Sequence, residues 1–155
     1  LFVLSRVLTA FVNFLLGCIP FAAVLAWYRA RVTVYYCMVP VVLLLFLAFT
    51  AGVSYMVSIW YVFQRDARNI HSNFIFILRF FVAMFYAVEW VSGGVQWVIK
   101  HNPVYAYIYV MRQCVVYGQW PEAMYLYQIV IWSAAMLLAG MLIFKKYENE
   151  VVERL

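Results

Sequence analysis

The stretch "KHNPVYAYIYVMRQCVVYGQWPE" (Lys100–Glu122) decides the fold, because it lies between two runs apolar enough to cross a membrane and yet is punctuated by prolines. Within it, Asn102 is a favourable helix N-cap and Pro103 suits the first helical position. Gly118 is suited to end that helix, and Pro121 to begin the next one. The pattern predicts a helix that is too short to cross a membrane.

A second short helix is predicted just upstream. The segment "WVSGGVQWVIK" contains Gly93-Gly94, a pair that breaks the preceding helix and permits a new segment ending at Lys100. We therefore expect two short re-entrant helices, over about 93–100 and 103–117, in the outer half of the membrane. Non-spanning backbone at that depth is tolerated only where protein or a water-filled cavity surrounds it.

The composition places the whole chain in a membrane. Hydrophobic residues make up 69% and charged residues 11%, with a mean hydropathy of +0.92, whereas about 25% of a soluble domain is charged. A length of 155 residues suits a single membrane domain over 1–155. The net charge of +5 is scattered at the ends of apolar runs, so it does not form the basic face of a nucleic-acid-binding protein.

Four runs predict transmembrane helices, at about 7–28, 38–63, 69–91 and 123–144, since roughly 20 apolar residues rising ~1.5 Å each cross a bilayer. Pro20 is expected to kink the first. The sequence thus predicts an all-α integral membrane protein with four transmembrane helices and two short re-entrant outer helices.

Four spans place both ends of the chain on the same side of the membrane. That side collects the basic residues Arg6, Arg65, Arg68, Lys145, Lys146 and Arg154. The opposite side has Arg29, Arg31, Lys100 and Arg112. Because basic residues concentrate in cytoplasmic loops, a cytoplasmic carboxy terminus is predicted.

In this order the elements resemble the permease (transmembrane) subunit of an ABC-2 type exporter, of the group that exports O-antigen, capsule or teichoic acid polymers. "FVLSRVLTAFVNFL" is similar to the start of that family's third span, "WYVFQRDARNI" to its turn between spans four and five, and "AMFYAVEWV" to the outer end of span five. The most specific part is an Asn-Pro-initiated helix, a Tyr-Gly-x-x-Pro turn, a last span and the basic tail "FKKYENEVVERL".

The resemblance implies the carboxy-terminal part of a six-span permease that begins at span three. Two copies would pair as a homodimer, and a separate ABC ATPase subunit would bind ATP-Mg and drive them. The cargo implied is a lipid-linked polysaccharide or teichoic-acid-like polymer, crossing the cell (cytoplasmic) membrane of a bacterium. Two departures from the family's pattern are Arg79, at a position that is usually apolar, and the proline-free "VAMFYA". Alternatives are an ABC-2 exporter of drugs or lipids, a membrane-embedded sugar or lipid transferase, and a scaffold for another subunit.

No catalytic chemistry is predicted in this chain. None of the six glycines forms a phosphate-binding loop, so no ATPase site is expected. His71 and His101 lie far in sequence from one another and from the carboxylates, which does not favour an enzyme site. The three cysteines lack CxxC spacing and indicate neither a disulfide framework nor a zinc site. No cofactor and no metal are expected.

Arg79 is the residue that the sequence singles out most sharply. An arginine at the centre of a span costs about 2.5–3.5 kcal/mol on insertion scales, so it should face a polar cavity or a partner instead of lipid. It would contact an anionic group of a transported substrate, or bond to backbone carbonyls or to spans outside this chain. The full set of transport-path candidates is Arg79, Tyr86, Glu89, Trp90, Trp97, Tyr105 and Tyr109.

The aromatic candidates have two explanations. Aromatic faces suit the C–H faces of passing sugar rings, but Trp and Tyr also anchor helices at the membrane interface. A third group of residues, Arg65, Asp66 and Arg68, forms either a contact for the ATPase or a solvated turn that obeys the positive-inside rule.

Overall fold

The computed structural model describes residues 2–27, 33–64, 66–82, 88–91 and 93–153. Every regular element within these ranges is a helix, which confirms the all-α prediction. The elements are α1 (Phe2–Trp27), η1 (Val34–Cys37), α2 (Met38–Phe63), α3 (Ala67–Phe81), η2 (Val88–Trp90), α4 (Gly94–His101), α5 (Pro103–Arg112), η3 (Gln113–Tyr117) and α6 (Ala123–Glu153).

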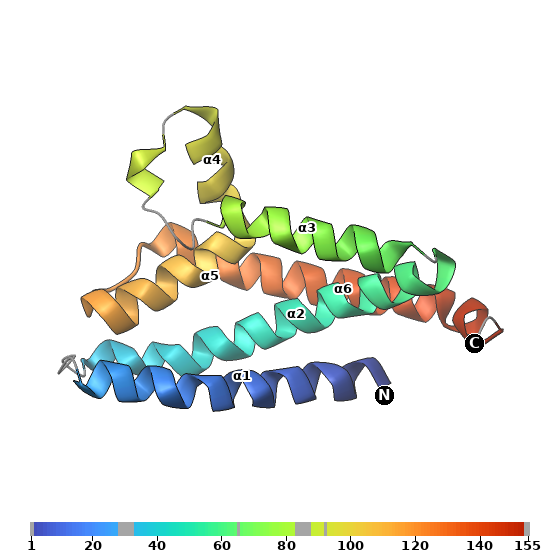
Figure 1. Cartoon of the computed structure of the whole chain (residues 1–155), viewed down its shortest axis with the longest axis horizontal. Coiled ribbons are helices and arrows are strands. Elements are labelled where there is room, and N and C mark those ends of the chain that lie inside the picture. The colour runs from blue at the N-terminus through green and yellow to red at the C-terminus, as the bar shows by residue number, and fades with distance from the viewer. Residues whose placement is uncertain (1, 28–32, 65, 83–87, 92, 154–155) are drawn as a thin grey trace.

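Three segments of these helices are long and apolar enough to cross a membrane, namely Val3–Trp27, Val34–Phe63 and Ala123–Tyr147. They indicate a membrane protein. In Figure 1 the long helices run roughly along one axis, and both termini lie toward the end at which α2 connects to α3. The other end gathers the start of α2, the end of α5 and the start of α6.

The predicted third span is not shown as one continuous helix. The structure has α3 with 15 residues, a length of about 22 Å against the ~30 Å of a hydrocarbon core. The 3-10 helix η2 follows at Val88–Trp90, and residues 83–87 lie outside the described part. The uncharged stretch between Arg68 and Arg79 is too short to cross by itself. The fourth crossing therefore stays a prediction.

The other predicted boundaries agree closely with the structure. The predicted span 38–63 has the same limits as α2, and α1 continues through Pro20 as far as Trp27. Helix α6 begins at Ala123 as predicted and extends beyond residue 144 to Glu153.

Helices α2 and α6 pack with backbone against backbone. A Cβ added to Gly52 would collide with the main chain of Met136, and a Cβ added to Gly140 would collide with the main chain of Gly52. Small residues allow this close approach, as they do between helices in membranes. On the side of the crossing toward the starts of both helices, the buried side chains include Val42 and Phe49 of α2 and Tyr125, Ile129 and Ser133 of α6.

The two predicted short helices are present. Helix α5 begins as expected, because the Asn102 side chain accepts a hydrogen bond from the Val104 amide at 2.9 Å and Pro103 occupies the first turn. The last turn widens into the π-helix η3, which ends at Gly118 with φ 59° in the left-handed region. Tyr36 of η1 donates its hydroxyl to the Val115 carbonyl at 3.1 Å, which ties this end to the start of α2.

Candidate functional site

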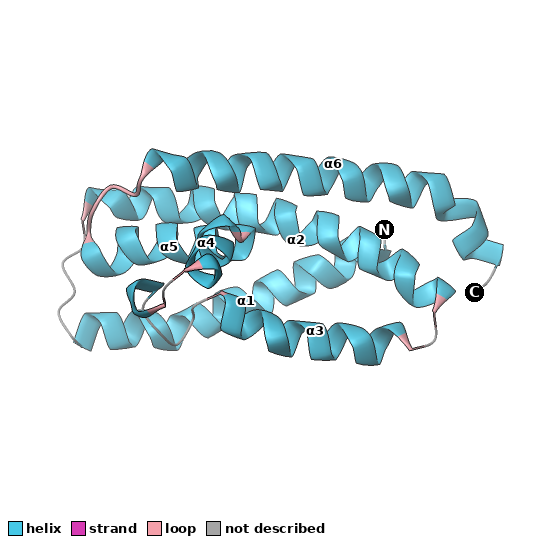
Figure 2. Ribbon diagram, turned by 90° about the horizontal axis from the view of Figure 1, so that it is seen from above, coloured by secondary structure: helices cyan, strands magenta, loops and turns pink. Residues whose placement is uncertain are grey.

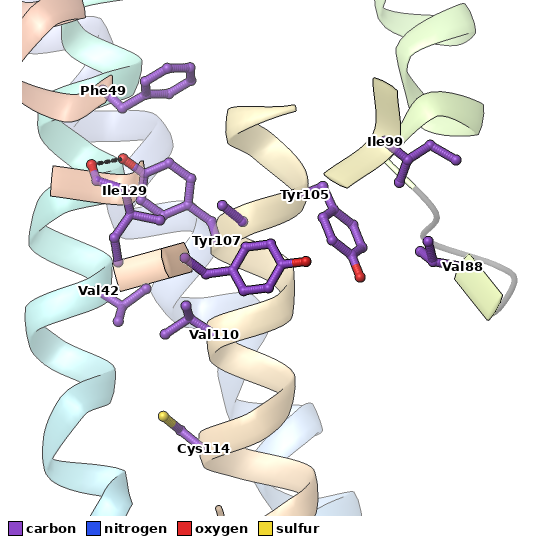
Figure 3. Packing of buried hydrophobic residues seen from close by; sticks show 11 residues of the cluster. Val42, Phe49, Val88, Ile99, Tyr105, Tyr107, Val110, Cys114 and Ile129 are labelled. Atoms are coloured by element: carbon purple, nitrogen blue, oxygen red, sulfur yellow. Dashed lines mark hydrogen bonds between the residues drawn. The ribbon is translucent and has the colours of Figure 1, made fainter. Parts of the chain in front are cut away.

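A buried tyrosine fixes the position of α5 against the two long helices beside it. The hydroxyl of Tyr107 has three acceptors within hydrogen-bonding distance for its single proton: the Ile129 carbonyl at 3.2 Å, the Leu45 carbonyl at 3.4 Å and the Ser133 hydroxyl oxygen. Figure 3 shows the bond from Tyr107 to Ile129. The Tyr107 ring lies edge-on to Phe46, with ring centroids 5.2 Å apart. Tyr107 therefore joins α5 to α2 and α6.

This contact sets the depth of the α4–α5 junction. Ile129 lies six residues after the first residue of α6, about 9 Å along the helix axis. Asn102 lies five residues before Tyr107, about 7 Å along the axis of α5 toward its start. Helices α5 and α6 run in opposite directions (Figure 1), so the two lengths add. The junction thus lies about 16 Å beyond the start of α6, close to half of a ~30 Å hydrocarbon core.

Arg79 reaches a similar depth from the other end of the bundle. Near its start, α3 is tied to the end of α2 by a 2.6 Å hydrogen bond between the Tyr61 hydroxyl and Nδ1 of His71. Arg79 is twelve residues after Ala67, which places it about 18 Å along α3. Both views show the last turns of α3 close to the junction of α4 and α5 (Figures 1 and 2).

Two basic residues therefore lie part-way along the bundle: Arg79, and Lys100 next to the junction. We call these two residues the mid-depth cations. Both side chains are exposed, and in the described part of the chain neither is in an ion pair. Each would cost about 2.5–3.5 kcal/mol if it faced lipid at the membrane centre. They require a polar surrounding or an anionic partner that is not part of the described residues.

The mid-depth cations have aromatic neighbours on α4. Nδ1 of His101 donates to the Trp97 carbonyl at 2.8 Å, and the two rings lie 4.3 Å apart between centroids. Trp97 is 64% exposed and Trp90, in η2, is 84% exposed. The structure therefore leaves both predicted tryptophans accessible.

The two predicted path tyrosines of α5 lie in different surroundings. Tyr105 is buried in the core, whereas Tyr109 is only half-buried and donates to the Glu122 carboxylate at 3.1 Å. The Tyr109 ring packs against Tyr125, with centroids 4.1 Å apart. Burial first and the Glu122 carboxylate second raise the pKa of the Tyr109 phenol, so it stays a neutral donor. Of the two, only Tyr109 has a side chain that is partly accessible.

Four predicted site residues are wholly or partly outside the described residues. Nothing is described of Arg65 or Tyr86, and nothing of the side chains of Arg68 and Glu89. Asp66 is exposed in the turn between α2 and α3, where its carbonyl accepts the amides of Asn69 and Ile70 at 3.1 and 3.2 Å. Within the described residues no three His, Cys, Asp or Glu side chains gather as metal ligands.

The sequence did not point to Lys100, His101 or Ser133 as parts of a site. The sequence predicts Lys100 at the outer membrane edge, and in the structure Lys100 lies next to the junction of α4 and α5, part-way along the bundle. A signal was present: a Lys-His pair immediately before an Asn-Pro helix start, inside an otherwise apolar region. Its depth depends on the register between α5 and α6, which local sequence does not encode.

Comparisons of the chain with protein-family models, with curated proteins and with solved structures found no match. Function is therefore argued from the residues and geometry of this chain.

Proposed function

We propose that this chain is part of the permease subunit of an ATP-driven ABC-2 exporter that moves an anionic, lipid-linked polymer across the cytoplasmic membrane. The cargo proposed is a polysaccharide or a teichoic-acid-like polymer, and two copies of the permease pair to form the path. ATP hydrolysis belongs to a separate subunit, since the sequence has no phosphate-binding loop.

The observation that carries the proposal is the hairpin of α4 and α5. Helix α5 starts at a capped Asn-Pro pair part-way along the bundle and ends at the end where α2 and α6 begin (Figure 1), so it is too short to cross a membrane and its first turn would expose polar backbone to lipid. Backbone of this kind is tolerated where it lines a water-filled cavity or is covered by protein. The ordered motifs of the sequence, ending in a last span and a basic tail, agree with this interpretation.

The chemistry of the proposed path supports an anionic cargo. The mid-depth cations would attract phosphate or carboxylate groups, and the exposed Trp97 and half-buried Tyr109 offer aromatic faces to sugar rings. The turn of Asp66 between α2 and α3 lies at the end of the bundle where the ATPase would dock (Figure 1).

The test uses the full-length subunit, purified by an affinity tag in lipid nanodiscs. We expect a nucleotide-binding subunit to co-purify at equal stoichiometry and to hydrolyse ATP. Addition of a phosphate-bearing polymer should stimulate hydrolysis more than addition of a neutral polysaccharide. A subunit that purifies alone and without ATPase activity would overturn the proposal, and sugar or lipid transfer would then be assayed without nucleotide.

A further inference from the structure

A cavity of about 460 Å³ lies between α1 and α2, beside the start of α3. None of its lining residues belongs to α4 or α5, although the lining residue Phe46 also packs against Tyr107 of α5 on its other side. One stripe of each long helix forms its walls. From α1 the lining residues are Val3, Arg6, Val7, Ala10, Phe11 and Phe14. From α2 they include Phe46, Leu47, Thr50, Val53, Val57 and Tyr61.

The two ends of this cavity differ in chemistry. One end holds the guanidinium of Arg6 and the hydrogen-bonded pair of Tyr61 and His71, whose Oη and Nδ1 atoms are 2.6 Å apart. Eight residues further along α1, at the other end, the walls are Phe14 and Phe46. The cavity therefore runs from a cationic, polar mouth to an apolar interior.

Thr50 and Ser58, two of the residues that bring hydroxyl groups into the wall, keep their hydroxyl protons within α2. Thr50 donates to the carbonyls of Phe46 and Leu47 at 2.9 and 3.0 Å, and Ser58 donates to the Tyr55 carbonyl at 2.8 Å. Because these protons are bonded within α2 itself, an apolar occupant would leave no donor of these two residues unsatisfied. The wall accepts a hydrocarbon chain.

The length of the cavity fits one leaflet of a bilayer. The lining residues extend over fifteen positions of α2, from Phe46 to Tyr61, and over eleven positions of α1, from Val3 to Phe14. These lengths correspond to about 22 Å and about 16 Å. Half of a bilayer with its headgroup region is about 20–22 Å. The mouth lies at the end of the bundle that carries the exposed Lys145 and Lys146 (Figure 1), as expected for headgroup level.

We propose that this cavity binds one anionic phospholipid of the leaflet at that end. Its phosphate lies at the end of the cavity that is lined by the positively charged Arg6. One acyl chain lies along Leu47 and Phe14. This lipid site goes beyond the proposed transport function and does not depend on it.

The first test compares phosphatidylglycerol with phosphatidylcholine by native mass spectrometry of the full-length chain. We expect Arg6→Gln to weaken phosphatidylglycerol binding about 10- to 100-fold, the size of a lost charge-assisted bond. The matched control is Lys145→Gln, which removes an exposed cation at the same end but outside the cavity, and should change binding less than about twofold. If both lipids bind equally well and Arg6→Gln does not change their binding, the cavity makes only general contact with lipid and the proposal is wrong.

The second test separates a lipid from a free phosphate or a protein segment. Leu47→Trp narrows the interior, whereas Leu44→Trp adds the same bulk at a position that is 63% exposed and does not line the cavity. We expect only Leu47→Trp to lose the lipid, with unchanged thermal unfolding and without loss of Arg6-dependent glycerol phosphate binding. If glycerol phosphate binds as tightly as the lipid, or if the full-length chain holds no lipid because another segment fills the cavity, the proposal fails.

Discussion

Two regions of this molecule have similarly apolar sequences but differ in how far their side chains are buried. Helices α2, α5 and α6 share a core that is closed by backbone contact at Gly52 and Gly140 and by the hydrogen bonds of Tyr107. Among the described residues of α1, in contrast, only Val7 is buried, and many of its large apolar side chains are exposed.

The buried region of α2, α5 and α6 is the scaffold of the molecule, and the other helices provide its exposed surfaces. In the α2–α5–α6 region each of the polar side chains Tyr107, Ser133 and Asn102 has a hydrogen-bond partner within the chain. Outside it, α1, α3 and α4 present exposed apolar faces together with the mid-depth cations. Exposed apolar faces on this scale mark contact with lipid or with another protein. We infer that the two regions should respond differently to substitution.

The largest expected effect is a loss of stability when the packing of α2 against α6 in the scaffold is disrupted. Gly52→Ala would place a Cβ against the main chain of Met136, and neither helix backbone can yield easily. We expect a loss of about 3 kcal/mol of unfolding free energy, at the upper end for overpacked sites. The measurement is unfolding of the detergent-solubilised protein by titration with SDS.

Gly17→Ala is the matched control for this substitution. A Cβ at Gly17 of α1 would meet no atom within 4 Å, and alanine is favoured over glycine in a helix by about 1 kcal/mol. We expect Gly17→Ala to be neutral or slightly stabilising. Equal stability of the two variants would show that α2 and α6 do not approach as closely as the structure has them.

Local sequence predicted the elements of both regions better than their contacts. The limits of α2 and the start and end of α5 followed from an uncharged run, a capping asparagine, a proline and a glycine, each of which acts on its own neighbours. The bond between Tyr107 and Ser133 joins residues 26 apart in the chain. It depends on which turn of α5 faces which turn of α6, and no local signal reports that register.

The same limit explains what was missed in the candidate site. Arg79 was identified because a charge inside an apolar run is costly wherever the helix packs. Lys100 was assigned to a membrane edge because only the chain position of the short helices was predicted, not their depth. The cavity at Arg6 needed two helices to be placed side by side before its polar and apolar ends could be recognised.

The second prediction concerns the mid-depth cations of the exposed region. We expect Lys100→Gln, and independently Arg79→Gln, to lower ATP-dependent export of an anionic polymer about 10- to 100-fold, since each removes a charge-assisted contact. Export would be measured in membrane vesicles that contain the full-length permease and its ATPase. Lys100→Arg should retain most of the activity because it keeps the charge.

Assembly is followed in the same samples to separate transport from folding. Because both cations are exposed and unpaired within the described residues, neutral variants should assemble and unfold like the wild type. Full export by both glutamine variants would show that neither cation contacts the exported polymer. If Arg79→Leu is stabilising and export persists, the scaffold alternative is favoured.

The third prediction concerns the start of α5, at the boundary between the two regions. Asn102→Ala removes the side chain that caps α5 at the Val104 amide, and we expect a cost of about 1 kcal/mol. Hydrogen exchange at the amides of the first turn of α5 should quicken, while exchange in α2 and α6 stays slow. Asn102→Ser keeps a capping oxygen and should behave nearly as the wild type does. Fast exchange in both variants would mean that the cap does not hold this turn.

The smallest expected effect tests how α5 is held against the scaffold. Tyr107→Phe keeps the ring between Phe46 and Phe49 but removes the hydroxyl, and interhelical hydrogen bonds in membranes are worth about 0.6 kcal/mol and at most about 1.7. Tyr127→Phe, at a position that is 69% exposed, is the control and should have no effect.

A double-mutant cycle of Tyr107→Phe with Ser133→Ala isolates the bond between these two hydroxyls. We expect a coupling of about 0.6 kcal/mol, because Ser133 also donates to the Ile129 carbonyl and keeps that partner when Tyr107 is changed. A coupling near zero would mean that the bond between these two hydroxyls adds nothing to stability, and that α5 is held by the ring contacts of Tyr107 and by its bonds to the Ile129 and Leu45 carbonyls.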